Sequence, residues 1–327
     1  MLRKKPNFFY CNDKISTLLI PLSWLYYICF LFLRKCFFKK KRICNKTVCV
    51  GNIVVGGSGK TPICITLQNE LSKYYDKICF VTKGYCRKSK SDIVIPRQHG
   101  LLFNINEVGD EPLLLSEYAD VFVIKKRNKA KCEDYDLAIC DDGFFDNSIH
   151  KDCQIVVFDC NFFIGNGKVL PAGPLRSKLD FLKKADFVIL TDINDNVNDN
   201  IDLLSNYIQK DRILQAELIV KSNHDKNKKY FAFSGIGENK KFFNSLAKYG
   251  IQLVDFLSFE DHKEYEEEDL EKIIKTFKNS LADCIITTSK DYLKLPNDFC
   301  VKNNVEVFEI SYEIKDVDKI ISFLIKD

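Results

Sequence analysis

The sequence lacks the usual marks of a metal-stabilised or disulfide-stabilised protein. It contains no Cys-x-x-Cys pair and only four histidines, His99, His150, His224 and His262, so a structural zinc site is not expected. The 14 cysteines are scattered singly through apolar runs, which favours buried thiols in a reducing compartment over a disulfide framework. No internal repeat and no long low-complexity segment is present. These absences leave an ordinary globular protein.

Charge is absent from residues 15–33, and positive charge crowds the segment that follows. The uncharged run is close to the roughly 20 residues that a helix needs to cross a bilayer, and Trp24, Tyr26 and Tyr27 can lie at headgroup level. Because Lys and Arg are denser after the run, the positive-inside bias places the following domain in the cytoplasm. We expect a single N-terminal anchor, either a span or a deep interfacial helix; a buried core helix and a signal peptide are the alternatives. The basic collar consists of Arg34, Lys35, Lys39, Lys40, Lys41, Arg42 and Lys46.

The length of 327 residues, the hydrophobic content of 46% and the net charge of only +4 fit a globular chain of two domains. From Lys46 onward, strand-like apolar runs alternate with helix-length segments, which predicts a mostly parallel sheet covered on both faces. We expect an anchor helix and collar in residues 1–42, a phosphate-loop domain in 43–215 and a smaller α/β domain in 216–327. The predicted strands are 48–55, 78–82, 121–124, 137–140, 155–159, 187–191, 214–220, 230–233, 253–256 and 284–288. The predicted helices are 62–75, 111–119, 177–185, 238–249 and 266–280.

A phosphate loop follows the first predicted strand. The run consists of Gly56, Gly57, Ser58, Gly59, Lys60, Thr61 and Pro62. Glycines allow backbone N–H groups to surround phosphate oxygens, Lys60 can reach the outer phosphates, and the Thr61 hydroxyl can ligate Mg²⁺. The predicted ligand is ATP or GTP with Mg²⁺. Val54 stands where the full Walker A pattern has glycine, so a glycine-rich turn without nucleotide is the alternative.

Carboxylates occupy two further positions of interest. Asp141 and Asp142 end an apolar strand, where a phosphate-loop enzyme carries its metal-binding acid; a solvated Asp-Asp-Gly turn is the alternative. Asp110 opens a helix, either as a helix cap or as a base that accepts the proton of an attacking hydroxyl. Both positions therefore have a structural and a catalytic interpretation.

Two further features lie in loops. The Gly165–Arg176 stretch is rich in Gly and Pro and ends in a guanidinium suited to phosphate. His262 follows Asp261 after a strand-like run. Alone, this histidine is more readily interpreted as a surface residue.

Together these stretches resemble the tetraacyldisaccharide 4'-kinase family, the lipid A kinases of Gram-negative envelopes. The resemblance runs in family order from about residue 18 to residue 294. Its most specific parts are Val108–Pro112 and the Gly165–Arg176 loop. It also covers the apolar N-terminal segment, the phosphate loop, Asp141–Gly143, Phe233–Gly237 and Asp261–His262.

The resemblance implies transfer of the γ-phosphoryl group of ATP to the 4'-hydroxyl of a membrane-embedded acylated glucosamine disaccharide 1-phosphate, giving lipid IVA. Asp110 would be the catalytic base, His262 would keep it ionised, and Lys60 would bind phosphates. Mg²⁺ would be held by Thr61, Asp141 and Asp142.

The same resemblance implies that Asn166 and Arg176 bind the lipid substrate. The protein would work on the cytoplasmic face of the inner membrane, where the anchor and basic collar meet anionic lipid. Neither nucleic acid nor an obligate protein partner is expected.

Several positions depart from the family pattern, including the Thr82–Cys86 run, where the family has Ser-Arg-Gly-Tyr-Gly. The family usually reads Asp-Asp-Gly-x-Gln-His, but Phe145 and Asp146 stand at the last two positions, and Ser177 replaces the Glu that usually follows the loop arginine. A degraded relative that binds nucleotide or lipid without turnover is therefore an alternative. A phosphate-loop ATPase switch ranks lower, because such proteins carry a signature Lys where this chain has Val54 and Val55.

Overall fold

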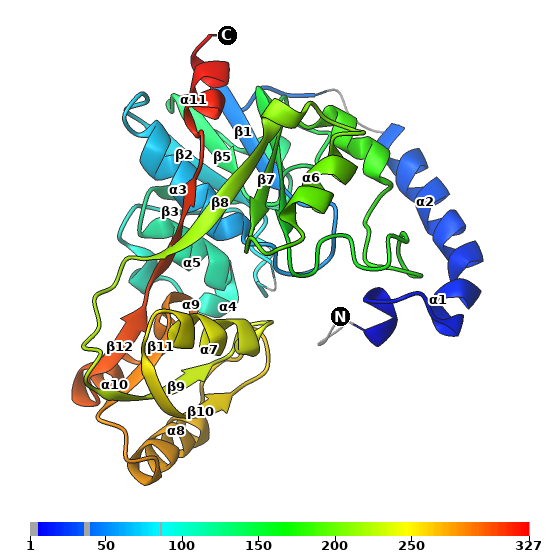
Figure 1. The fold of residues 1–327 in the computed structure, drawn as a ribbon. Helices are drawn as coiled ribbons and strands as arrows, with labels where there is room; N and C mark the ends of the chain where they lie inside the picture. Colours follow the sequence, from blue (N-terminus) through cyan, green and yellow to red (C-terminus); the bar gives the residue numbers. More distant parts are fainter. Residues whose placement is uncertain (1–5, 36–39, 86, 327) are drawn as a thin grey trace.

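The computed structural model describes residues 6–35, 40–85 and 87–326. Figure 1 shows a large α/β body, a smaller α/β body attached to one end of it, and two N-terminal helices on the side of the large body away from that end. The expected class, an α/β protein with a second, smaller unit, is confirmed.

The large body is built on a nine-stranded sheet in the order β13-β8-β7-β6-β1-β5-β2-β4-β3. All neighbouring strands run parallel except the two edge pairs, β3 with β4 and β13 with β8. The sheet is therefore mixed at its edges and parallel at its centre. Its strands are β1 (Lys46–Gly51), β2 (Ile78–Thr82), β3 (Ile93–Ile95), β4 (Asp120–Val123), β5 (Leu137–Cys140), β6 (Cys153–Asp159), β7 (Phe187–Thr191), β8 (Ile213–Val220) and β13 (Ile310–Ile314).

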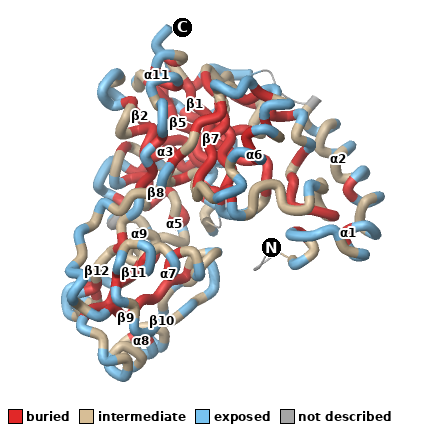
Figure 2. Tube along the Cα trace, viewed as in Figure 1, coloured by how far each residue is buried: buried red, intermediate tan, exposed pale blue. Residues whose placement is uncertain are grey.

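Helices cover both faces of the large sheet, which explains why its central strands are apolar throughout. α3, α5 and α11 pack on one face, and α6 and η4 pack on the other. Figure 2 shows the buried residues concentrated along the central strands. The helices of this body are α3 (Lys60–Leu71), α4 (Ile105–Val108), α5 (Asp110–Ser116), α6 (Val197–Leu204) and α11 (Asp318–Ile325), with 3₁₀ turns η2 (Gly100–Leu102), η3 (Arg127–Lys129), η4 (Leu179–Lys184) and η5 (Lys210–Arg212).

The smaller body contains a four-stranded parallel sheet in the order β10-β9-β11-β12. Apolar side chains from both faces of this sheet are buried under its helices. Its elements are β9 (Lys229–Ser234), α7 (Asn239–Lys248), β10 (Gln252–Ser258), α8 (Glu267–Asn279), β11 (Cys284–Thr288), α9 (Ser289–Tyr292), α10 (Asn297–Lys302) and β12 (Val305–Phe308).

The chain crosses between the bodies twice. β8 leads into the smaller body, and β13 returns and pairs antiparallel with β8, with Ile310 opposite Val220. α11 then buries Ile320, Ile321 and Leu324 in the core of the large body. Residues 310–325 were expected in the smaller unit, but their apolar faces complete the large sheet and its core.

The uncharged N-terminal run does not form one continuous helix. It divides into α1 (Lys14–Leu18) and α2 (Ile20–Lys35), preceded by the turn η1 (Asn7–Phe9). Pro21 lies in the first turn of α2, where its missing N–H is tolerated and a new helix begins. Among the described residues, no helix has both the length and the apolar character required to cross a membrane. Lys39 of the collar lies outside the described residues.

Several predicted elements differ from the structure, among them the first strand and the third helix. β1 ends at Gly51, not Val55, because the following residues turn away into the phosphate loop. The helix predicted at 177–185 is the six-residue 3₁₀ turn η4.

Candidate active site

The phosphate loop joins β1 to α3 at the carboxyl edge of the large sheet. Gly59 is the N-cap of α3 and has a φ of 77°, in the left-handed region that favours glycine. Lys60 and Thr61 begin the helix, and no side chain caps its N-terminus in the described structure. The N–H groups of this helix end are therefore suited to an anion.

The Gly165–Arg176 loop braces the phosphate loop, which accounts for valine where Walker A has glycine. Val54 forms an antiparallel bridge with Leu175. The Val55 N–H donates to the Pro174 carbonyl at 2.9 Å, and the Arg176 N–H donates to the Ile53 carbonyl at 2.7 Å. The Val54 side chain is buried in the core between the loops. The phosphate loop and the Gly165–Arg176 loop, which were predicted separately from the sequence, are thus hydrogen-bonded to each other.

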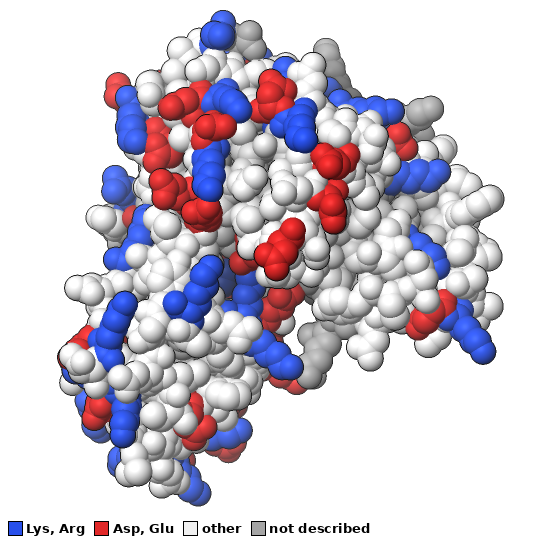
Figure 3. Space-filling view, in the orientation of Figure 1, with Lys and Arg blue, Asp and Glu red and all other residues white. Residues whose placement is uncertain are grey.

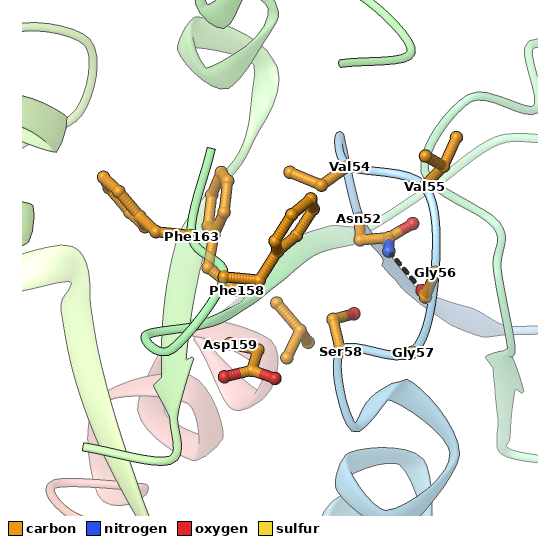
Figure 4. A pocket seen from close by; sticks show the side chains of 11 residues that line it. Asn52, Val54, Val55, Gly56, Gly57, Ser58, Phe158, Asp159 and Phe163 are labelled. Carbon is orange, nitrogen blue, oxygen red and sulfur yellow. Dashed lines mark hydrogen bonds between the residues drawn. The ribbon is translucent and has the colours of Figure 1, made fainter. Parts of the chain in front are cut away.

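A cavity of about 10 Å³ lies between the phosphate loop and the end of β6 (Figure 4). The Asn52 amide nitrogen donates to the Gly56 carbonyl at 3.3 Å across the base of the loop. The Asn52 Oδ1 and Ser58 Oγ atoms, both buried, have no hydrogen-bond partner in the described structure. Buried polar groups normally have partners, so these atoms mark the inside of the loop as a site for a polar ligand.

Asp141 has the environment expected of a metal-binding carboxylate. Thr61 Oγ1 donates to Asp141 Oδ2 at 3.0 Å, whereas the buried Asp141 Oδ1 has no hydrogen-bond partner among the residues that the structure describes. Burial and the nearby Glu111 carboxylate raise the pKa of Asp141 to about 6, against a lowering by Lys60. An unpaired carboxylate oxygen beside a threonine hydroxyl fits Mg²⁺, which binds through one or two carboxylates together with phosphates and waters.

Asp142 faces two cations. Its carboxylate accepts hydrogen bonds from Arg176 Nη1 at 3.0 and 3.1 Å. Lys60 Nζ lies 3.9 Å from the same carboxylate. Among the described residues, no group of three or more His, Cys, Asp or Glu side chains could by itself hold a metal ion. The structure thus brings Lys60, Thr61, Asp141, Asp142 and Arg176 together at one edge.

Asn166 lies in a different environment. Its amide nitrogen donates to the Phe8 carbonyl at 2.7 Å, the Ala172 carbonyl at 2.9 Å and Ser16 Oγ at 3.2 Å. Its Oδ1 accepts from the Lys168 N–H at 3.0 Å. Asn166 therefore holds the loop against the N-terminal segment, and its contact with substrate stays a prediction.

Asp110 and His262 meet across the two bodies. His262 Nδ1 lies 2.9 and 3.1 Å from the Asp110 carboxylate oxygens, and Asp110 is only 6% exposed. Burial would raise the pKa of Asp110, but the hydrogen bond from His262 and the charges of Lys290 and Lys294 hold it well below its usual range. The same hydrogen bond raises the pKa of His262. This buried carboxylate is therefore ionised, as a general base must be.

Two lysines that sequence reasoning missed lie beside this pair, one on Asp110 and one on the adjacent Glu111. Lys294 Nζ lies 3.7 Å from Asp110, and Lys290 Nζ lies 3.1 Å from Glu111. Both lysines follow β11, which was predicted as a strand. The signal was available, because Lys290 lies two residues after the carboxyl end of that strand, where ligands of parallel sheets bind.

The departures at 145 and 146 are accommodated by packing and by charge. Phe145 packs edge-on against Phe30 at a ring distance of 5.4 Å. Asp146 pairs with the buried Arg127 at 3.2 Å and lies 3.7 Å from Lys83. The negative charge that Asp146 adds near the Asp141–Asp142 pair is therefore balanced by two cations.

Comparisons with known proteins agree with this geometry. The family model for tetraacyldisaccharide-1-P 4'-kinase, LpxK, matches residues 15–326. A tetraacyldisaccharide 4'-kinase of Rickettsia bellii is 37% identical over 296 residues, covering 89% of each chain. One of Rickettsia canadensis is 35% identical over 316 residues, covering 94% of this chain and 93% of the relative.

The fold agrees as well. The crystal structure of an "apo" form of LpxK from Aquifex aeolicus in complex with ATP superposes with a TM-score of 0.77 at 25% identity, covering 95% of this chain and 99% of that chain. The chain therefore belongs to the tetraacyldisaccharide 4'-kinase family and has its kinase function in lipid A biosynthesis.

Proposed function

We propose that Asp110 is the general base of this kinase and that His262 keeps it ionised and oriented. The observation that carries the proposal is the 2.9 Å contact between these side chains at the sheet edge that also holds the phosphate loop. Asp110 takes the proton of the 4'-hydroxyl as that oxygen attacks the γ-phosphorus of ATP. The negative charge of the phosphates is met by Lys60 and by the N–H groups of Gly56, Gly57, Ser58 and Gly59.

ATP is the proposed phosphoryl donor, and Mg²⁺ the proposed metal. The Aquifex relative was crystallised with ATP. The unpaired Asp141 Oδ1 and the Thr61 hydroxyl beside it are the groups that would hold Mg²⁺, with Asp142 next to them. When bound, the metal would neutralise charge on the phosphate oxygens. The Asp142 carboxylate is itself held by ion pairs with Lys60 and Arg176.

The proposed acceptor is tetraacyldisaccharide 1-phosphate, reached at the cytoplasmic face of the inner membrane. α2 supports this placement, because one of its faces packs on the large body and the other exposes large apolar side chains. Tyr27, Phe30 and Leu31 lie on the packed face. The exposed large apolar side chains of α1 and α2 are Ile15, Leu18, Leu22, Trp24, Leu25, Ile28, Phe32 and Leu33.

An apolar surface of this size favours an interface with lipid. The surface over α1 and α2 carries few charges in Figure 3. Tyr26 Oη donates to the Arg176 carbonyl at 3.2 Å, and Ser23 Oγ donates to the Val169 carbonyl at 2.8 Å, so the membrane-facing helix contacts the active-site loop directly. We propose that α1 and α2 form the single N-terminal anchor, lying in the membrane interface, with Asn166 and Arg176 near the bound lipid.

The test is a mass-spectrometric assay of purified protein in detergent with Mg-ATP and tetraacyldisaccharide 1-phosphate. Asp110→Asn is expected to lower kcat by about 10²- to 10⁴-fold while ATP affinity stays near that of the wild type. Asp318→Asn is the matched control, because Asp318 also begins a helix but is exposed and far from the site in sequence. Near-normal turnover by Asp110→Asn would show that another group is the base.

A further inference from the structure

The smaller body directs three cationic side chains at the start of α5. His262 and Lys294 approach Asp110, and Lys290 approaches the adjacent Glu111. Charged side chains of both signs gather where the two bodies meet (Figure 3). The three cations are not equivalent, because they differ in how many partners hold them.

Lys294 is fully engaged. It is 2% exposed and lies 3.4 Å from Asp291 and 3.7 Å from Asp110. Asp291 is itself completely buried and accepts hydrogen bonds from the Gly235 N–H at 3.0 Å and from Thr288 Oγ1 at 2.7 Å. Asp291 therefore fixes the start of α9, which carries Lys290, against the sheet of the smaller body.

Lys290 has a different environment on the same rigid platform. Its side chain is 26% exposed, and the Glu111 carboxylate accepts its hydrogen bond at 3.1 Å. Burial would lower the pKa of Lys290, but Glu111, Asp110 and Asp141 together raise it, so the ammonium group is charged. Lys290 thus interacts electrostatically with both the proposed base and the proposed metal ligand.

This position is informative because the function proposed above places phosphoryl transfer between those two groups. The nucleotide phosphates approach from the side of Lys60 and Asp141, and the acceptor hydroxyl approaches from the side of Asp110. Lys290 pairs with Glu111, the neighbour of Asp110, and its pKa is raised by Asp141 as well, so it lies close to the proposed path of the transferred group. Negative charge on the oxygens of that group is the main feature that such an enzyme must neutralise.

We propose that Lys290 is a further catalytic residue, which turns from Glu111 to the oxygens of the transferring γ-phosphoryl group. In this step the 4'-oxygen forms a bond to the γ-phosphorus, and the bond from that phosphorus to the oxygen bridging the β-phosphate breaks. ADP leaves with the bonding electron pair, and the hydroxyl proton goes to Asp110. This role of Lys290 rests on the functions proposed above for Asp110 and the phosphate loop.

The competing role for Lys290 is a latch, in which its ion pair with Glu111 only holds the two bodies together. A latch would act equally on ATP affinity, on stability and on turnover, and Glu111→Gln would reproduce its loss. A catalytic cation acts on the transition state and leaves ATP affinity nearly unchanged.

The experiment compares Lys290→Met, Lys290→Arg, Glu111→Gln and Asp110→Asn, with Lys275→Met as a control at an exposed lysine of α8. Each variant is assayed for kcat and for ATP affinity. Binding of ADP with Mg²⁺ and aluminium fluoride, a mimic of the transferring phosphoryl group, is measured by calorimetry in the presence of the lipid acceptor. Thermal unfolding checks that each variant is folded.

Lys290→Met is expected to lower kcat by about 10²- to 10³-fold, to leave ATP affinity within about threefold, and to abolish the tight aluminium fluoride complex. Lys290→Arg is expected to restore part of both properties, and Lys275→Met to change neither. Near-normal kcat and aluminium fluoride binding in Lys290→Met, with Asp110→Asn inactive, would overturn the role of Lys290 alone. Equal losses of ATP affinity in Lys290→Met and Glu111→Gln would also overturn it, in favour of the latch. Turnover by Asp110→Asn would instead refute the proposed base.

Discussion

Arg127 Nη1 lies 3.2 Å from Asp146 Oδ2, and this ion pair is buried directly behind the carboxylates at the end of β5. Arg127 also donates to the backbone carbonyl of Asp141, so the pair is connected to the proposed metal ligand. Asp146 accepts further hydrogen bonds from the Ser148 N–H and Oγ at 2.9 and 2.6 Å. The residue that departs from the family pattern is therefore part of the support for the site.

Asp146→Ala is expected to lower the free energy of unfolding by about 3 kcal/mol, since removing one partner of a buried ion pair leaves the other charge uncompensated. It should also lower kcat, because Arg127 would no longer hold the Asp141 backbone. Urea unfolding and the lipid kinase assay measure the two effects. Asp180→Ala removes an exposed ion pair with Lys183 and should change stability by less than about 1 kcal/mol. Equal effects of the two substitutions would refute this role for Asp146.

Asp141→Asn is expected to make the metal-free protein more stable at pH 7 while abolishing kinase activity. The folded-state pKa of Asp141, about 6, is above its unfolded value. Ionisation of Asp141 therefore destabilises the folded protein. The wild type has its full stability below about pH 4 and loses part of it as the pH rises through 6. At pH 7 the gain should be about 2 to 3 kcal/mol, and it should vanish near pH 4. A variant less stable than the wild type at pH 7 without metal would contradict this.

His262→Ala is expected to move the acid limb of the pH profile of kcat/KM to higher pH. The hydrogen bond from His262 lowers the pKa of Asp110, so its loss should raise that pKa. Because the pKa of His262 is raised, protonated His262 contributes stability that is fully present below about pH 6.5 and is lost as the pH rises through the folded-state value. Glutamine can donate a hydrogen bond without charge, so the acid limb of His262→Gln should lie between those of the wild type and His262→Ala. An unchanged acid limb in His262→Ala would separate this histidine from the base.

Replacing Trp24 and Phe32 together by serine should weaken binding to anionic phospholipid vesicles by at least about tenfold, because each large apolar side chain contributes roughly 1.5 to 3 kcal/mol when buried in lipid. Both side chains are exposed, so the free energy of unfolding should hardly change. Sedimentation with vesicles measures the binding. Val301→Ser on α10, also at an exposed apolar residue, is the control. Undiminished sedimentation would place the membrane contact elsewhere.

Local sequence patterns predicted the parts of the site that depend on local chemistry. The phosphate loop follows one buried strand, and Asp141 and Asp142 follow another. Because these strands pair in parallel, their carboxyl ends meet at the same edge of the sheet. Contacts between strands that are far apart in the sequence could not be predicted from local patterns. Ile310–Ile314 has an ordinary strand pattern, but its antiparallel partner, β8, is separated from it in the sequence by the whole smaller body. The contact of His262 with Asp110, 152 positions apart, was expected through the family resemblance and not from periodicity. Lys290 was missed because a lysine after a strand is usually a surface residue.

The return of β13 to β8 also bears on how the protein is made. Tyr312 of β13 lies against Gly59 of the phosphate loop, and its carbonyl accepts a hydrogen bond from Thr66 of α3 at 3.0 Å. On the ribosome, the phosphate loop emerges long before the strand that supports it. The whole smaller body must be synthesised in between. A nascent chain that is still short of β13 therefore holds an incomplete nucleotide site, and ATP can first help to stabilise the kinase only after β13 has emerged and paired with β8.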